Sequence, residues 1–320
     1  MRVSIIIVAY DSGAFLQPCV DALAAQSCSQ FDAVIVDNAS SDDAVARLVL
    51  PDERFRICQM GYNSGFAAAN NRAVQQSSAE YVVLLNPDTE VQPGWLEALV
   101  EAADAYPMAA SIGSVQRRLD DPRDLDGLGD VWHLAGLAWR SGEGRKASNA
   151  VLDGEIFGPC AAAALYRRDR FLAAGGFDER YFCYMEDVDL AFRLRLAGHR
   201  AMRAGKAVVL HAGSGTTGRT SDFSLYHGHR NRIWTFLKNT PRSVFPFALA
   251  YHLAFNTLYA LIAIRRGFWR PIFRAYRDAW RGREPFLAER RARPPRMPIS
   301  EFLRISAWTP WSPWGRAERP

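Results

Sequence analysis

Three carboxylates in four consecutive positions are the part of this sequence best suited to chemistry. Glu186, Asp187 and Asp189 open a predicted amphipathic helix, close behind the aromatic residues Phe182 and Tyr184. Acidic side chains in a first helical turn complement the helix macrodipole, and this alone could account for the cluster. A carboxylate held against apolar side chains can instead act as a general base toward a hydroxyl group. These residues alone leave both interpretations open.

Other polar side chains that could bind a ligand follow short β-branched segments. Asp37 could accept hydrogen bonds from a nucleobase or a ribose, or it could begin a turn. Asn86 and Asp88 could hold Mg²⁺ beside a phosphate, although Asn-Pro-Asp is more often an ordinary turn. His211 could be a metal ligand or a structural histidine. Asn63 precedes a helix whose N-terminus could face phosphate, but helix capping would explain that segment equally well.

The surrounding sequence predicts strands that alternate with helices. Such alternation indicates a mostly parallel sheet with helices on both faces. Ligands bind such sheets beyond the carboxyl ends of the strands, where residues 10–11, 37 and 86–88 fall. The predicted strands are 3–9, 33–36, 54–59, 81–85, 161–166 and 207–210, and the predicted helices are 14–26, 43–50 and 66–76.

Two segments depart from this alternation. Residues 116–156 are rich in glycine, aspartate and arginine, and we predict an irregular insertion there that is functional or mobile. A loop rich in glycine, serine and threonine is predicted from His211 to Thr220.

The chain beyond Pro241 differs in kind. Residues 244–264 are long enough to span a bilayer. Because His252, Asn256 and Tyr259 fall on one helical stripe, we expect instead a helix that lies in the interface or packs on the domain.

A second C-terminal helix is predicted to be basic and amphipathic. This pattern is typical of a helix on a membrane surface, although its aromatic face could also dock on the core. One face carries Arg270, Arg274, Arg277 and Arg281, and another carries Trp269, Ile272, Phe273, Tyr276 and Trp280. Residues 291–320 are predicted to be extended or disordered.

Composition narrows the class of protein. The 320 residues, 49% hydrophobic and 23% charged, are typical of a folded globular protein. A net charge of +5 and an arginine-rich segment from Arg265 onward suggest an anionic surface as partner, and we expect lipid and no nucleic acid. The five cysteines lack the spacing of a zinc site or a disulfide framework, which indicates a reducing cytoplasm. No P-loop or GxGxxG follows the first strand, which disfavours kinases and dinucleotide dehydrogenases, and no signal peptide is expected.

Taken in order, these segments resemble the family 2 glycosyltransferases. The resemblance covers about residues 1–240 and implies the GT-A fold, an α/β fold with a mostly parallel, Rossmann-like central sheet flanked by helices. The sequence from Leu84 to Thr89 is most similar to the rhamnosyltransferase branch. The matching segments are 3–10, 34–42, 63–70, 84–89 and 175–193.

The resemblance implies a domain division and a role for each candidate residue. A GT-A domain would occupy 1–240, with a donor half of about 1–115 and an acceptor half of about 116–240, followed by a C-terminal helical extension at 241–290 and a tail at 291–320. Asp187 would be the catalytic base, and Asp88 and His211 would hold Mg²⁺ or Mn²⁺ at the diphosphate. The family often has Asp where Asn86 stands. Donor contacts would come from Ala9, Tyr10, Asp37, Asn63, Asn86 and Asp88, and acceptor contacts from Glu186, Cys160 and Trp132.

The activity implied is an inverting transfer of a sugar from a nucleotide-diphosphate donor to a hydroxyl of a glycan or polyprenyl-linked acceptor. dTDP-rhamnose is the first candidate donor, with UDP-sugars as a second class. The location implied is the cytoplasm, peripheral on the inner face of a bacterial cell membrane, in cell-surface polysaccharide synthesis. A catalytically silent nucleotide-sugar-binding or scaffolding subunit is the alternative. A nucleotidyltransferase is disfavoured because residues 10–14 contain no lysine or arginine.

Overall fold

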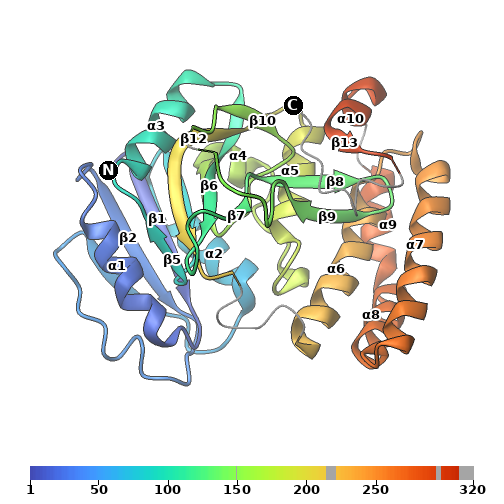
Figure 1. Cartoon of the computed structure of the whole chain (residues 1–320), viewed down its shortest axis with the longest axis horizontal. Helices are drawn as coiled ribbons and strands as arrows, with labels where there is room; N and C mark the ends of the chain where they lie inside the picture. The colour runs from blue at the N-terminus through green and yellow to red at the C-terminus, as the bar shows by residue number, and fades with distance from the viewer. Residues whose placement is uncertain (149, 214–220, 293–296, 310–320) are drawn as a thin grey trace.

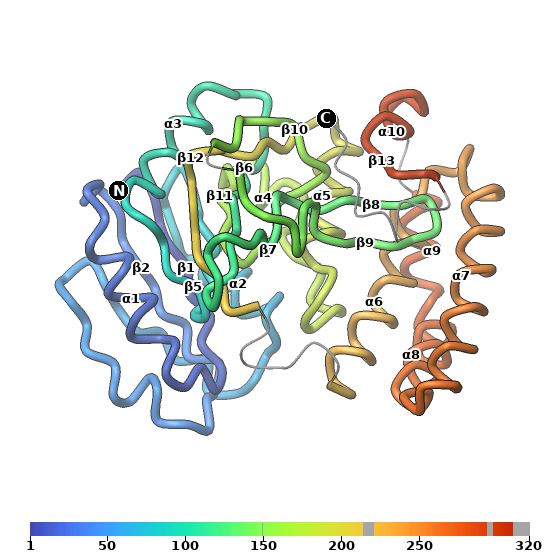
Figure 2. The backbone as a smooth tube through the Cα atoms, viewed as in Figure 1, coloured from blue at the N-terminus to red at the C-terminus, as the bar shows by residue number. Residues whose placement is uncertain are grey.

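The computed structural model describes residues 1–148, 150–213, 221–292 and 297–309. Figure 1 shows a large sheet flanked by helices in the N-terminal part of the chain, and a group of C-terminal helices beside it. The tube view in Figure 2 shows the same division, with α7 at the outer edge of the C-terminal group.

The central sheet is parallel where its first strands pair. β1 (Val3–Ala9) lies between β2 (Phe31–Asp37) and β4 (Tyr81–Leu85), and β3 (Phe55–Gln59) extends this side. Antiparallel β11 (Ala163–Arg167) joins β4 to the long strands β6 (Ala109–Arg118) and β12 (Arg200–His211), which are parallel to each other. Short strands β5 (Thr89–Val91), β7 (Leu125–Gly127) and β10 (Gly154–Ile156) pair at the margins of β12 and β6. The predicted α/β class with a mostly parallel sheet is confirmed.

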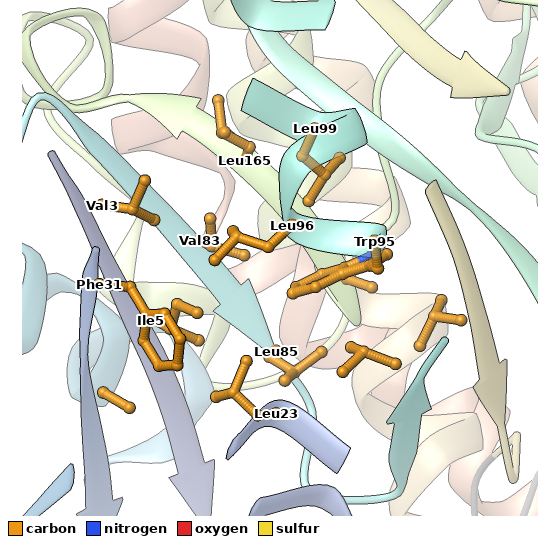
Figure 3. Packing of buried hydrophobic residues seen from close by; sticks show 14 of the residues in the cluster. Val3, Ile5, Leu23, Phe31, Val83, Leu85, Trp95, Leu96, Leu99 and Leu165 are labelled. Atoms are coloured by element: carbon orange, nitrogen blue, oxygen red, sulfur yellow. The ribbon is translucent and has the colours of Figure 1, made fainter. Parts of the chain in front are cut away.

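Helices cover both faces of this sheet because successive side chains of a strand point to opposite faces. Val3, Ile5 and Ile7 of β1 pack on one face with α1 (Leu16–Ala24) and α3 (Trp95–Ala105), as Figure 3 shows for part of this cluster. Ile6 and Val8 pack on the other face with α2 (Gly65–Gln76), α4 (Arg168–Ala173) and α5 (Glu186–Leu196). Short 3₁₀ turns, Gly13–Phe15 and Glu179–Tyr181, precede α1 and α5.

Two expectations for the N-terminal part of the chain are wrong. Residues 43–50 form turns instead of a helix, and the segment makes few backbone hydrogen bonds. One reason is that Pro51 disfavours helical geometry in the residue before it. Residues 116–156 are not an irregular insertion. They contain β7 and β10 and a separate hairpin, β8 (Asp130–His133) and β9 (Leu137–Arg140).

The C-terminal part of the chain contains five helices within the described residues, α6 (Asp222–Asn239), α7 (Phe245–Arg265), α8 (Trp269–Arg281), α9 (Arg283–Ala292) and α10 (Ile299–Ile305). The expectation of an extended or disordered tail is wrong for its described part. Phe302 of α10 is fully buried against Phe192, and β13 (Ser306–Ala307) pairs with β8. Pro294, Pro295 and residues 310–320 lie outside the described residues, as does the predicted loop over 214–220.

Helix α7 leaves most of its apolar surface uncovered. It is the one helix among the described residues that is long and apolar enough to cross a bilayer, and 17% of its most apolar window is buried. The polar stripe predicted on it faces the protein: His252 is buried with Nδ1 2.8 Å from the Ala135 carbonyl oxygen, and Asn256 accepts a hydrogen bond from Arg232. The stripe therefore packs on the domain.

A buried ion network joins α5 to α6. The Asp189 carboxylate has no exposed side-chain surface and accepts hydrogen bonds from Arg193 Nε (2.8 Å), Lys238 Nζ (2.9 Å) and Asn239 Nδ2 (2.7 Å). Burial opposes ionisation, but the charges of Arg193 and Lys238 outweigh it and hold the pKa of Asp189 below its usual value. Asp178 shares Lys238 at 2.6 Å. The network fixes the acidic helix against its neighbour.

Replacing Asp189 with Ala should lower the free energy of unfolding by about 3–5 kcal/mol, because it leaves the buried Arg193 guanidinium without its carboxylate partner and removes one of the two carboxylates that accept hydrogen bonds from Lys238. Denaturant unfolding near neutral pH measures this change. A matched control is Glu289→Ala, which removes a carboxylate 3.6 Å from the same lysine at a partly exposed site and should cost less than about 1 kcal/mol. Equal costs for the two variants would contradict the argument. Since the folded-state pKa of Asp189 is depressed, its contribution should be lost as pH falls below the ordinary value of about 3.9.

Candidate active site

A cavity of about 710 Å³ opens at the carboxyl ends of β1 and β4, where a sheet of this type binds its ligands. Its volume suits a ligand of several rings. Residues far apart in the sequence meet in its wall. Its polar and acidic members include Tyr10, Asn38, Asn63, Asn86, Asp88, Asp130, Arg140, Cys160, Glu186, Asp187 and His211.

One side of the cavity carries oxygen and nitrogen atoms suited to a cation. Asn86 Oδ1 is buried and accepts no hydrogen bond from the described residues. The buried carboxylate of Asp88 places Oδ1 3.4 Å from Nε2 of His211. That separation is near the roughly 3 Å between neighbouring ligands of an octahedral cation with bonds of about 2.1 Å. Asp88 and His211 can thus supply two ligands to a hard divalent cation. The described residues contain no group of three or more His, Cys, Asp or Glu side chains that could hold a metal ion by themselves.

His211 is held from its other ring nitrogen. Nδ1 lies 2.6 Å from Asp126 Oδ2, and the same oxygen accepts a hydrogen bond from Arg140 Nη1. Burial opposes a charged imidazole, but the hydrogen bonds to Asp126 and Asp88 outweigh it and raise the pKa of His211. Asp126 is fully buried beneath the cavity wall.

The turn that opens α2 is built by side chains of the loop after β2. Asn38 Nδ2 donates to Asn63 Oδ1 (3.0 Å), while Asn38 Oδ1 accepts from the backbone N–H of Ser64 (2.9 Å). Gly65 has a φ of +81°, and a Cβ there would lie 2.5 Å from the carbonyl oxygen of Phe182. The glycine therefore lets the α2 N-terminus approach the loop that precedes the acidic helix.

That loop reaches the cavity through strained backbone. Phe182, Tyr184 and Met185 all have a positive φ, a backbone conformation that residues other than glycine rarely adopt. Asn231 of α6 stabilises this strained loop. Its Nδ2 lies 2.8–2.9 Å from three backbone carbonyl oxygens, those of Tyr181, Cys183 and Tyr184. A single buried amide thus holds the loop in place.

Three carboxyl groups meet at the far side of the cavity, the buried ones of Glu186 and Asp130 and the half-buried one of Asp187. Asp187 accepts hydrogen bonds from the backbone N–H groups of Ala161 (3.1 Å) and Val188 (2.8 Å), which limit the rise that burial causes in its pKa. Glu186 Oε2 and Asp130 Oδ2 are buried and accept no hydrogen bond from the described residues. Burial and the neighbouring Asp187 charge raise the pKa of both groups well above the usual range. Asp187 is therefore the first of the three to ionise.

Most of the predicted site residues lie at this cavity, and three do not. Ala9 is buried in β1, next to the lining residue Val8, and Asp37 accepts a hydrogen bond from its own turn at Ser40 N (2.9 Å). The acceptor contact predicted for Trp132 is wrong, because its ring is fully buried among the aromatic side chains Phe157 and Phe192. Cys160 lines the cavity, where burial raises the pKa of its thiol.

Sequence reasoning missed four residues of the site. Asp126, Asp130 and Arg140 belong to the segment predicted to be irregular, and Asn231 lies within a helix that the sequence reading did not delimit. One signal was available: residues 124–130 place aspartates at 124, 126 and 130 among leucine and glycine, an acid-rich apolar pattern that suggests buried carboxylates. Nothing in the sequence indicates that these residues lie beside His211.

The sequence and the fold are similar to those of known glycosyltransferases. Residues 4–172 match the profile of glycosyl transferase family 2. An N-acetylglucosaminyl-diphospho-decaprenol L-rhamnosyltransferase of Mycobacterium tuberculosis is 29% identical over 252 residues, which are 71% of this chain and 81% of that protein. An O-antigen biosynthesis protein of Myxococcus xanthus is 30% identical over 66% of this chain and 17% of its own length. A mannosyltransferase of Pyrobaculum calidifontis, solved with GDP-Man and Mn²⁺, has a TM-score of 0.53 at 17% identity and covers 91% of this chain and 86% of its own.

Replacing Asp187 with Asn should lower the pKa of Glu186, because the Asp187 charge is one of the causes that raise it. Titration of the side-chain carboxyl carbons by ¹³C NMR measures this change in the isolated protein. Asp178→Asn serves as a control that removes a carboxylate from the same chain segment without adjoining Glu186, and it should leave that titration in place. An unchanged Glu186 titration in the Asp187 variant would show that the two carboxyl groups are not coupled.

Proposed function

The chain belongs to glycosyl transferase family 2, a family of inverting hexosyltransferases, and we propose that it transfers rhamnose from dTDP-rhamnose to a polyprenyl-linked glycan in cell-surface polysaccharide synthesis. The choice of sugar and acceptor is supported by the similarity to the mycobacterial rhamnosyltransferase, whose name includes a lipid-linked substrate. The proposal keeps the division into a donor half of about 1–115 and an acceptor half of about 116–240.

In this proposal the donor nucleotide lies along the Asn38 and Asn63 side of the cavity. Tyr10 at the rim and Asn63 at the start of α2 contact the base and the diphosphate, and Asp37 orients the turn beside them. Asp88 and His211 would hold Mg²⁺ or Mn²⁺, and Asn86 Oδ1, which accepts no hydrogen bond from the described residues, is an oxygen available to the cation or the donor. A cation held there would neutralise charge on the diphosphate leaving group.

Asp187 is the proposed general base. It takes the proton of the acceptor hydroxyl, whose oxygen attacks the anomeric carbon from the face opposite the diphosphate. The bond from that carbon to the diphosphate oxygen breaks, so one displacement inverts the anomeric configuration. The observation that carries this assignment is that Asp187 accepts hydrogen bonds from two backbone N–H groups, while burial and the Asp187 charge raise the pKa of Glu186 and Asp130. In this proposal Glu186 and Asp130, when protonated, donate hydrogen bonds to other hydroxyls of the acceptor.

Asp187→Asn should lower kcat by about 10²- to 10⁴-fold while donor binding is retained, because the amide cannot accept the proton. Transfer of rhamnose from dTDP-rhamnose measures kcat, and thermal shift with dTDP, UDP, GDP and CMP, with and without Mn²⁺, measures nucleotide binding. A metal-dependent shift with one nucleotide supports the donor site. Equal turnover by the variant would remove Asp187 from its role. Nucleotide binding by the wild-type protein without transfer to any acceptor tested would favour the catalytically silent subunit.

We also propose that α7 and α8 rest on the inner face of the cell membrane. Leu253 and Leu261 of α7 and Trp269, Phe273 and Trp280 of α8 are exposed, and arginines lie between and beyond them. Exposed apolar side chains with basic neighbours are the combination that anionic bilayers bind. Such a location would bring a polyprenyl-linked acceptor to the enzyme.

Changing Leu253 and Leu261 together to Glu should shift the protein from vesicles of phosphatidylglycerol and phosphatidylcholine to the supernatant in a sedimentation assay. Truncation after Pro241 is a poorer test, because it also removes the buried side chains Phe286 and Phe302. Val49→Glu is the matched control, since Val49 is 69% exposed in the N-terminal part of the chain and should not affect vesicle binding. Sedimentation of the double variant like wild type would contradict the membrane proposal.

A further inference from the structure

The proposed cation ligand His211 lies in a chain of three buried polar side chains. On the side of the ring that faces the cavity, Nε2 lies 3.4 Å from Asp88 Oδ1. On the opposite side, Nδ1 lies 2.6 Å from Asp126 Oδ2. The side chain of Asp126 has no exposed surface, and that of His211 is 6% exposed. Asp126 therefore touches the ring without entering the cavity.

Asp126 is fixed in place by the strands around it. Its Oδ2 also accepts a hydrogen bond from Arg140 of β9. The Arg140 side chain crosses β7 at Gly127, where an added Cβ would lie 2.9 Å from Arg140 Cβ. The absence of a side chain at Gly127 lets the guanidinium reach Asp126, and the ion pair then holds the carboxylate against His211.

We propose that Asp126 is a positioning residue that keeps the proton of neutral His211 on Nδ1 and directs the Nε2 lone pair toward a cation held beside Asp88. Three groups face the ring: Asp126 Oδ2 lies 2.6 Å from Nδ1, Arg140 Nη1 lies 3.4 Å from the same nitrogen, and Asp88 Oδ1 lies 3.4 Å from Nε2. A carboxylate is an acceptor only, so the short contact with Asp126 requires a neutral imidazole to donate from Nδ1, whereas the contacts of Arg140 and Asp88, which would favour the other tautomer, are both longer. Such partners orient metal-binding histidines and raise their basicity. This inference rests on the proposed role of His211 as a cation ligand.

A purely structural role for Asp126, that of neutralising buried Arg140, makes a different prediction. If Asp126 only neutralised Arg140, its removal would change neither the nitrogen of His211 that carries the proton nor the affinity of the site for a cation. The tautomer and the cation affinity therefore separate the two roles.

The first measurement uses the intact wild-type protein without metal. Two-bond ¹H–¹⁵N correlation spectra distinguish the two neutral tautomers of histidine, and the chain has six histidines to resolve. His211→Gln assigns the signal, which is recorded at a pH where the ring is neutral. We expect the Nδ1–H form. An Nε2–H form in the wild-type protein would overturn the proposal. Because this measurement needs no Asp126 variant, the proposal remains testable even if such variants fold poorly.

The second measurement is the affinity for Mn²⁺ in the presence of dTDP, by isothermal titration of the full chain. Asp126→Asn should weaken Mn²⁺ binding by about ten- to a hundredfold, because the amide can also present N–H to Nδ1 and so favour the wrong tautomer. Asp124→Asn is the matched control: it removes a neighbouring carboxylate that pairs with Lys146 and should leave Mn²⁺ affinity unchanged.

The outcomes separate the inference from the function on which it rests. Weaker Mn²⁺ binding in both His211→Gln and Asp126→Asn, with the Nδ1–H tautomer in the wild type, supports the proposal. Weaker binding in His211→Gln alone overturns the role of Asp126 and leaves the cation site standing. Unchanged binding in His211→Gln overturns the cation role of His211 and this inference with it.

Discussion

The burial of Asp189 between Arg193 and Lys238 is the interaction on which the site depends. α5 begins at Glu186, so the position of Asp187 in the cavity is set by where the first turn of α5 is anchored. A buried carboxylate with two cations and an amide has one favourable arrangement, and leaving any member unpaired is costly. The ion network therefore fixes the helix, and Asn231 of the same partner helix fixes the loop before it.

Three acids within one helical turn acquire different properties from their surroundings. Asp189 faces cations and has a depressed pKa, Asp187 accepts hydrogen bonds from backbone N–H groups, and Glu186 Oε2 has no hydrogen-bond donor among the described residues and a raised pKa. The macrodipole argument from the sequence treats the three alike. The surroundings of each carboxyl group separate the anchor Asp189 from the proposed base Asp187 and from Glu186.

The sequence predicts well what depends on local pattern. Runs such as 3–9 and 81–85 are strands because they are apolar and β-branched, and the oxygen-bearing side chains that follow them reach the expected edge of the sheet. The expected GT-A fold agrees with the likeness to the solved mannosyltransferase. The failures depend on distant partners. Strand β8 forms because it pairs with β9 and with β13, some 170 residues away, and Trp132 is buried because Phe157 and Phe192 surround it.

The segment that the sequence reading left irregular contributes the electrostatics of the site. β8 and β9 bring Asp130 and Arg140 into the cavity wall, and β7 places Asp126 behind it. Other acids of the wall come from the turn after β4 and from α5. Arg140 lies between the two sets: it bonds to Asp126, and its charge also favours the ionised forms of Asp130 and Asp187. One guanidinium thus offsets part of the repulsion that would otherwise accumulate among carboxylates on both sides of the cavity. The hairpin that carries Arg140 therefore lowers the cost of ionising acids on both sides of the cavity.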